Sequence, residues 1–186
     1  RDLWCSFELL RGALGETSYR AEIRKALSPG ETKPPPKNYQ RLWRLRPHGV
    51  LSLNLDAFAQ RAFSELNPGR LLHSFNGKQM GSHTHLLKSS QPYLVHLHGR
   101  SEDRTSWVFT HEELGRLLKN SQYVQFLSTV LMTQTVVMVG ITPDDIAVGG
   151  HLDGLRKLGI DFGVHYWITD RTDEASRTYA EEVGLR

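Results

Sequence analysis

The stretch Pro92-Tyr-Leu-Val-His-Leu-His-Gly-Arg100 decides the fold. Its residues alternate so that His96 and His98 share one side, a pattern typical of a buried strand that directs both imidazoles to one face. Gly99 follows and lets the backbone turn beside the second histidine. Open α/β sheets bind their ligands at such strand ends. Taken alone, the stretch is explained more simply as a core strand with two hydrogen-bonded histidines.

The composition indicates a globular protein. The chain has 186 residues, of which 39% are hydrophobic and 23% charged. Its net charge of +3 is too balanced to predict direct nucleic-acid binding. The single cysteine, Cys5, excludes an intramolecular disulfide and a Cys-x-x-Cys metal pair, and favours a reducing, cytoplasmic location. No apolar run approaches the ~18 residues that suggest a membrane span.

Strand and helix patterns alternate along the chain. Buried strands are expected at 50–54, 92–98, 135–139 and 164–169, with a further short strand at 107–109. Helices are expected at 3–14 (ended by Gly15), 18–27, 38–45, 57–66, 110–131 with a pause at Asn120, 146–158 and 173–183. Prolines break the chain between 29 and 36, and 70–91 is expected to be a flap or an ordered loop.

This alternation predicts a Rossmann-like, doubly wound α/β fold with a mostly parallel sheet and helices on both faces. We expect residues 1–186 to form a single domain. Polar or turn-forming residues follow the predicted strands: Asn54, Asp56, His98, Gly140, Thr142 and Asp170. Because the carboxyl ends of parallel strands share one edge, these residues are predicted to converge on a nucleotide-type site with acid–base chemistry. Asp56 is also a candidate cap for the helix that follows it.

Four segments resemble those of bacterial SIR2-like (sirtuin-like) domains. Leu51-Ser-Leu-Asn-Leu-Asp56 and the helix after it resemble the Thr-Thr-Asn-Tyr-Asp segment of that family. Tyr93–Gly99 resembles the Lys-Leu-His-Gly strand, and Trp107–Glu113 resembles the segment after it. Val136–Asp145 resembles the Val-Gly-Tyr-Ser-Leu-x-Asp turn. Order and approximate spacing agree over residues 50 to 170.

The resemblance implies a fold that binds NAD and that, in many bacterial members, hydrolyses it as an effector of antiphage defence. Carried over, Asn54 would position water or the ribose, and His98 would act as a base. Asp56 would lie near the nicotinamide, while Gly140 and Thr142 would approach the cofactor backbone. Breaking the nicotinamide–ribose bond creates an oxocarbenium-like centre, where an ordered amide and a tunable base can guide a nucleophile.

The chain also departs from the family pattern. The Gly-Ala-Gly-x-Ser loop that holds the pyrophosphate is absent, and with no initiator methionine we expect 1–186 to be a fragment that begins after that loop. Ser52-Leu53 replaces the usual Thr-Thr, and Ile141-Thr142 replaces a tyrosine–serine pair. One cysteine cannot supply the four-cysteine zinc module of protein-deacetylating sirtuins, so no zinc is expected and hydrolysis is favoured over deacylation.

Other interpretations stay open. The domain could be a non-catalytic module that binds NAD or ADP-ribose or assembles with partners, or a sirtuin-type NAD-dependent deacylase. A weaker alternative is a metal hydrolase that uses His96, His98 and Asp103. The resemblance further implies a sensor domain or partner subunit, and it is compatible with a homo-oligomer.

Overall fold

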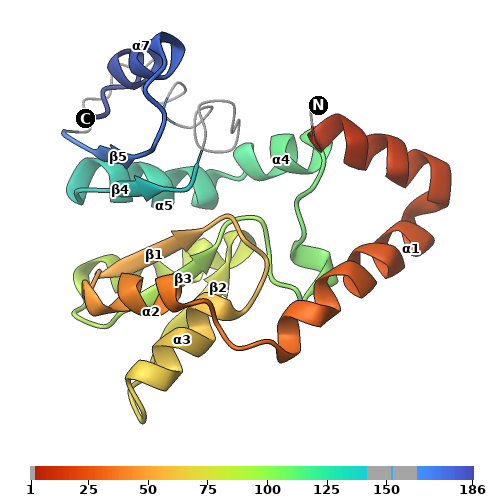
Figure 1. Cartoon of the computed structure of the whole chain (residues 1–186), viewed down its shortest axis with the longest axis horizontal. Coiled ribbons are helices and arrows are strands. Elements are labelled where there is room, and N and C mark those ends of the chain that lie inside the picture. Colours follow the sequence, from red (N-terminus) through yellow and green to blue (C-terminus); the bar gives the residue numbers. More distant parts are fainter. Residues whose placement is uncertain (1–2, 142–151, 153–162) are drawn as a thin grey trace. The chain divides into compact units, whose positions relative to one another are not determined.

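The computed structural model describes residues 3–141, 152 and 163–186, which form an α/β protein (Figure 1). The chain divides into two compact units, an N-terminal unit, Arg1–Leu117, and a C-terminal unit, Leu118–Arg186. Among these described residues, three parallel strands belong to the first unit and two to the second. The predicted parallel α/β class is therefore confirmed, and the doubly wound arrangement of one sheet stays a prediction.

The N-terminal unit begins with helix α1, Leu3–Thr32, which is interrupted at Gly15. Gly15 has φ 72° and ψ 159°, a conformation outside the helical region, and the predicted break between two helices is confirmed there. The predicted helix end at residue 27 is wrong, because the helix continues to Thr32. Pro29 removes one backbone donor, and the helix ends only at the approach to the proline run 34–36.

Two short helices, α2 (Lys37–Arg44) and α3 (Phe58–Leu66), pack against each other through aromatic side chains. The Trp43 and Phe63 rings meet edge to face with centroids 4.9 Å apart. The Trp43 indole Nε1–H donates to the Ala59 carbonyl at 2.7 Å, so the buried indole has its polar atom satisfied. This fixes the orientation of α2 on α3.

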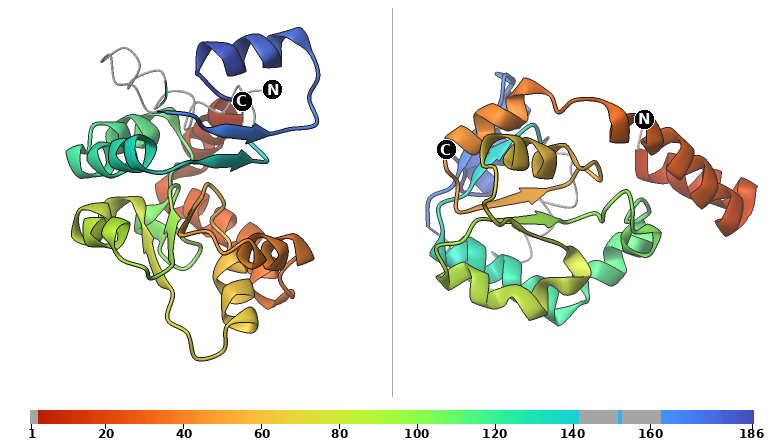
Figure 2. Two further views of the ribbon diagram at one scale, coloured as in Figure 1. Left: turned by 90° about the vertical axis from the view of Figure 1, so that its left-hand side faces the viewer. Right: turned by 90° about the horizontal axis from the view of Figure 1, so that it is seen from below.

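A three-stranded parallel sheet lies beside these helices. Its order is β1 (Gly49–Ser52), β3 (Tyr93–His96) and β2 (His73–Asn76), with β3 in the middle. All four residues of β3 are buried, which confirms the predicted core strand. Helices α2 and α3 lie on one side of the sheet and the 3₁₀ segment η1 (Gly77–Lys88) on the other (Figure 2).

Two further local predictions in this unit are wrong. Residues 70–91 were expected to be a flap or an ordered loop, but most of them, 73–88, form β2 and η1. Strand β2 has one buried apolar side chain, that of Phe75, so its four residues show no hydrophobic alternation. Residues 107–109 do not form a strand. Trp107 instead joins Tyr19 and Ile23 of α1 in a hydrophobic cluster, which explains the apolar residues there without a strand partner.

The described part of the C-terminal unit contains α5 (Ser121–Thr133), the parallel strands β4 (Val137–Val139) and β5 (Tyr166–Ile168), and α7 (Glu174–Glu182). Helix α4, His111–Leu118, precedes α5. Asn120 separates the two helices and caps α5, since its Oδ1 accepts from the N–H groups of Gln122 and Tyr123. The predicted pause at Asn120 is confirmed.

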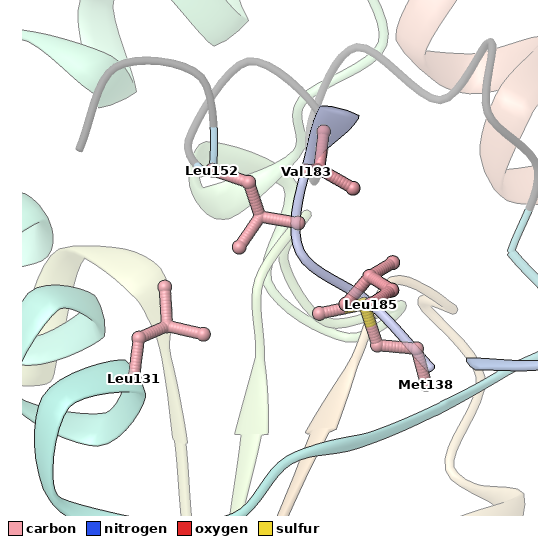
Figure 3. Packing of buried hydrophobic residues seen from close by; sticks show 5 residues of the cluster. All are labelled: Leu131, Met138, Leu152, Val183 and Leu185. Atoms are coloured by element: carbon pink, nitrogen blue, oxygen red, sulfur yellow. The ribbon is translucent and has the colours of Figure 1, made fainter. Parts of the chain in front are cut away.

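The core of the C-terminal unit is a small apolar cluster (Figure 3). Its buried members are Leu131 of α5, Met138 of β4, Leu152, and Val183 and Leu185 near the chain end. Apart from Leu152, the predicted helix at 146–158 lies outside the described residues.

Gly99 provides a test of the turn that ends β3. Its φ is +99°, and a Cβ placed there would collide with the Ser106 backbone carbonyl. Gly69 is a matched control, because it also has a positive φ (+79°) but no atom lies within 4 Å of where its Cβ would be. We expect Gly69→Ala to cost about 1 kcal/mol of unfolding free energy. Gly99→Ala should cost about 3 kcal/mol or more, because overpacking adds to the backbone strain.

Urea unfolding of both variants, followed by tryptophan fluorescence, measures these costs. Equal destabilisation by the two substitutions would contradict the tight approach of residues 99 and 106.

Candidate functional site

The carboxyl ends of the three strands in the N-terminal unit lie at one edge of the sheet. Ser52 at the end of β1 and Asn76 at the end of β2 are both in register with His96, the last residue of β3. The chain then runs from β1 to Asn54 and from β3 to His98. In parallel α/β sheets this is the edge at which ligands bind.

Asn54 is exposed in the loop that leaves β1. Its side-chain Nδ2 donates to the Tyr39 hydroxyl at 2.9 Å, and its backbone N–H donates to Ser52 Oγ at 3.2 Å. Burial raises the pKa of Tyr39, and the nearby charge of Asp56 acts in the same direction. The Tyr39 phenol therefore stays protonated and holds the Asn54 amide in one orientation at the edge.

Asp56 has a clear structural role. Its Oδ1 accepts a hydrogen bond from the Phe58 backbone N–H at 2.9 Å, at the first residue of α3. The predicted capping contact is thus confirmed, although Ala57 is the residue that directly flanks the helix.

His96 is only 2% exposed and lies against the Asn54 backbone. Its Nδ1 is 3.4 Å from the Asn54 carbonyl oxygen. Because a carbonyl only accepts, this contact requires the hydrogen on Nδ1, which leaves Nε2 as the acceptor nitrogen. Nε2 is buried and has no hydrogen-bond partner among the described residues. Burial lowers the pKa of His96, so the ring is neutral near pH 7.

His98 lies in the turn after β3, because the strand ends two residues earlier than predicted. It is 8% exposed, and its ring contacts the Trp4 ring edge to face with centroids 5.6 Å apart. Its carbonyl accepts from the Val108 N–H at 3.0 Å. The two imidazoles therefore have different neighbours. The His96 ring lies against the loop that contains Asn54, and the His98 ring contacts helix α1.

Asn76 is a further polar residue at this edge that the sequence patterns did not single out. It is buried, its Nδ2 donates to Asp103 Oδ2 at 3.2 Å, and its side chain caps η1. Hydrogen bonds from Thr105 lower the pKa of Asp103, which keeps its carboxylate charged. The spacing Asn76-x-x-Gln79 is typical of a capping box, and this spacing is the sequence signal that could have identified Asn76 as the cap of η1.

In the C-terminal unit, Gly140 follows β4 with φ 70°, as expected for a glycine that turns the chain there, and the rest of the predicted strand-to-helix turn, 142–145, lies outside the described residues. No atom of the described residues lies within 4 Å of where its Cβ would be, and its positive φ is a backbone conformation that favours glycine. Thr142 lies outside the described residues. Asp170 follows β5 and is exposed.

One group of three potential metal ligands occurs among the described residues. Donor atoms of Cys5, Glu8 and His111 lie within 4.8 Å of one another. The Glu8 carboxylate already accepts hydrogen bonds from the His111 N–H at 3.0 Å and from its Nδ1 at 3.3 Å. These bonds explain the proximity of Glu8 and His111. Within the same residues, His96, His98 and Asp103 do not form such a group.

Residues 48–186 match the family model of the SIR2-like domain. The chain belongs to the SIR2-like family. SIR2-like domains use NAD as a substrate, and the matched range contains Asn54, His96 and His98. No curated protein matches the chain. None of the helices in the described part combines the length and the apolar character needed to cross a membrane.

The buried state of His96 predicts a pH dependence. The folded-state pKa lies below the ordinary value near 6.5, so the unfolded chain binds a proton in a pH range where folded His96 does not. The stability contributed by neutral His96 is complete above about pH 6.5 and is lost as pH falls through the folded pKa. A pH titration of the ring by heteronuclear NMR should give a midpoint below 6.5 and the Nδ1–H tautomer.

As the pH falls from about 6.5 to the folded-state pKa of His96, the variant His96→Gln should lose less unfolding free energy than the parent protein. Burial also lowers the pKa of His165 in the C-terminal unit, whose titration should be unchanged by this substitution. A His96 midpoint at or above 6.5 would contradict the buried, neutral ring.

Proposed function

We propose that this SIR2-like domain is an NAD hydrolase that cleaves the nicotinamide–ribose bond and acts as an effector of bacterial antiphage defence. The proposal rests on one observation above all: within a range that matches an NAD-using family, an oriented asparagine amide follows β1 at the carboxyl edge of a parallel sheet. A histidine follows the adjacent strand, β3.

In the proposed reaction, water attacks the ribose carbon that carries nicotinamide. The carbon–nitrogen bond breaks, and its electron pair neutralises the positive nicotinamide ring. His98 accepts the proton lost by the water and later releases it to solvent. The products are nicotinamide, ADP-ribose and one proton. Asn54 orients the water or the ribose through its amide, which Tyr39 holds at 2.9 Å.

Asp56, Gly140 and Thr142 are proposed to contact NAD, as the resemblance implies. For Asp56 this role would be additional to its hydrogen bond with Phe58. His96 supports the site indirectly, because its Nδ1 contacts the Asn54 carbonyl.

A non-catalytic NAD- or ADP-ribose-binding module is the second candidate. The burial of His98 against Trp4 favours it, because a base that activates water must be reached by that water. In either case we propose that a sensor domain or partner subunit, or a homo-oligomer, controls the domain in the cytoplasm. A sirtuin-type deacylase is a third candidate. The single cysteine argues against it, because one cysteine cannot provide a four-cysteine zinc module.

Incubation of the chain with NAD, followed by chromatographic quantification of nicotinamide and ADP-ribose, tests the hydrolase. Asn54→Ala and His98→Ala should each reduce the rate by about 10²-fold or more. Asn38→Ala and His85→Ala are matched controls at exposed positions and should retain activity. Far-UV circular dichroism of each variant checks that it is folded.

Undiminished turnover in both site variants would refute the assigned residues. Thermal stabilisation by NAD without release of nicotinamide would establish the binding module instead. Nicotinamide release only in the presence of an acetyl-lysine peptide would identify a deacylase.

A further inference from the structure

A cleft of about 710 Å³ opens at the amino ends of the strands in the N-terminal unit. His48 immediately precedes β1 and Pro92 immediately precedes β3, and both line it. The Tyr93 N–H donates to the His48 carbonyl at 3.2 Å, which joins these two segments. Asn54 and His98 follow the opposite, carboxyl ends of the same strands, and neither lines the cleft.

The cleft has an excess of positive charge. Arg44, Arg46 and Arg70 line it, and all three are exposed. No carboxylate residue contributes to the lining. Within the part of the chain that the structure describes, none of these three guanidinium groups forms an ion pair. Three uncompensated cations around one concavity raise the local concentration of anions.

The backbone at Arg46 is unusual. With φ 54°, Arg46 is the one non-glycine residue of the described chain with positive φ. It follows Leu45, the C-cap of α2, and its N–H donates to the Trp43 carbonyl at 3.0 Å. Glycine or asparagine usually occupies this position because a β-carbon there is strained. An arginine at this place costs stability, which is typical of residues kept for binding.

Apart from the arginines, the cleft is lined by apolar and aromatic residues and by the polar side chains of His48, Asn67 and Ser90. Trp43 and Phe63 are buried and packed edge to face, so the floor of the cleft is fixed. The ring of His48 packs against that of Tyr93 with centroids 5.2 Å apart. His48 Nε2 is buried and has no hydrogen-bond partner among the described residues.

We propose that this cleft binds a small polyphosphate anion at a site separate from the NAD-cleaving edge. Planar guanidinium groups bind phosphate oxygens in pairs, which explains arginine in place of lysine at all three positions. The volume lies in the usual range for small-molecule sites, roughly 300–1,000 Å³. Inorganic pyrophosphate is the minimal ligand with this chemistry.

Isothermal titration calorimetry of the chain with pyrophosphate tests the site. Binding should weaken at least tenfold in the triple variant Arg44→Gln/Arg46→Gln/Arg70→Gln. The control Arg41→Gln/Arg171→Gln/Arg177→Gln removes the same charge from exposed positions outside the cleft and should leave affinity within twofold. Arg46→Gly should weaken binding and also raise the melting temperature, because glycine relieves the positive φ.

Three results would overturn the proposal. Equal loss of affinity in both triple variants would mean non-specific attraction. Loss of pyrophosphate binding in Asn54→Ala, with the arginine variants unaffected, would place the anion at the carboxyl edge. Tighter binding of a poly-glutamate peptide than of pyrophosphate would identify the cleft as a surface for an acidic protein. Failure of NAD hydrolysis alone would leave this site intact, since its test does not use turnover.

Discussion

Parallel hydrogen bonding of β3 to β1 on one side and to β2 on the other aligns Ser52, His96 and Asn76 at one level of the sheet. The pairing continues past the strand, where the Leu97 N–H donates to the Ser52 carbonyl at 2.8 Å. A slip of one residue would turn every side chain of β3 to the opposite face. The contact between His96 and the Asn54 loop therefore depends on this register, and so does the candidate site.

The loop that follows β3 is also held in place by specific contacts. Gly99 approaches the Ser106 backbone closely, and the Arg100 N–H donates to Ser106 Oγ at 3.0 Å. Asp103 in the same loop accepts from Asn76 at the end of β2. The loop after β3 is thus held by hydrogen bonds within itself and by one to the end of β2. The amino edge differs, because its arginines have no acidic partner among the described residues.

Local patterns predicted the features that local chemistry determines. The break at Gly15, the cap at Asn120 and the contact of Asp56 with the first turn of α3 each follow from one residue and its immediate neighbours. Strand β2 was not predictable in this way, since pairing with β3 stabilises a segment that has a single buried apolar residue, Phe75. The arginine cleft also required the fold, because it joins residues from 43 to 92 that no motif connects.

Binding of an NAD analogue in which a methylene group replaces the ribose ring oxygen tests the location of the site most directly. This analogue resists cleavage, so backbone amide chemical shifts can be followed at saturation. If NAD is cleaved at the carboxyl edge, the largest shifts should fall at residues 52–56 and 96–99. Shifts confined to residues 44–48 and 63–70, or no shifts at all, would contradict a catalytic site at the carboxyl ends of β1 and β3.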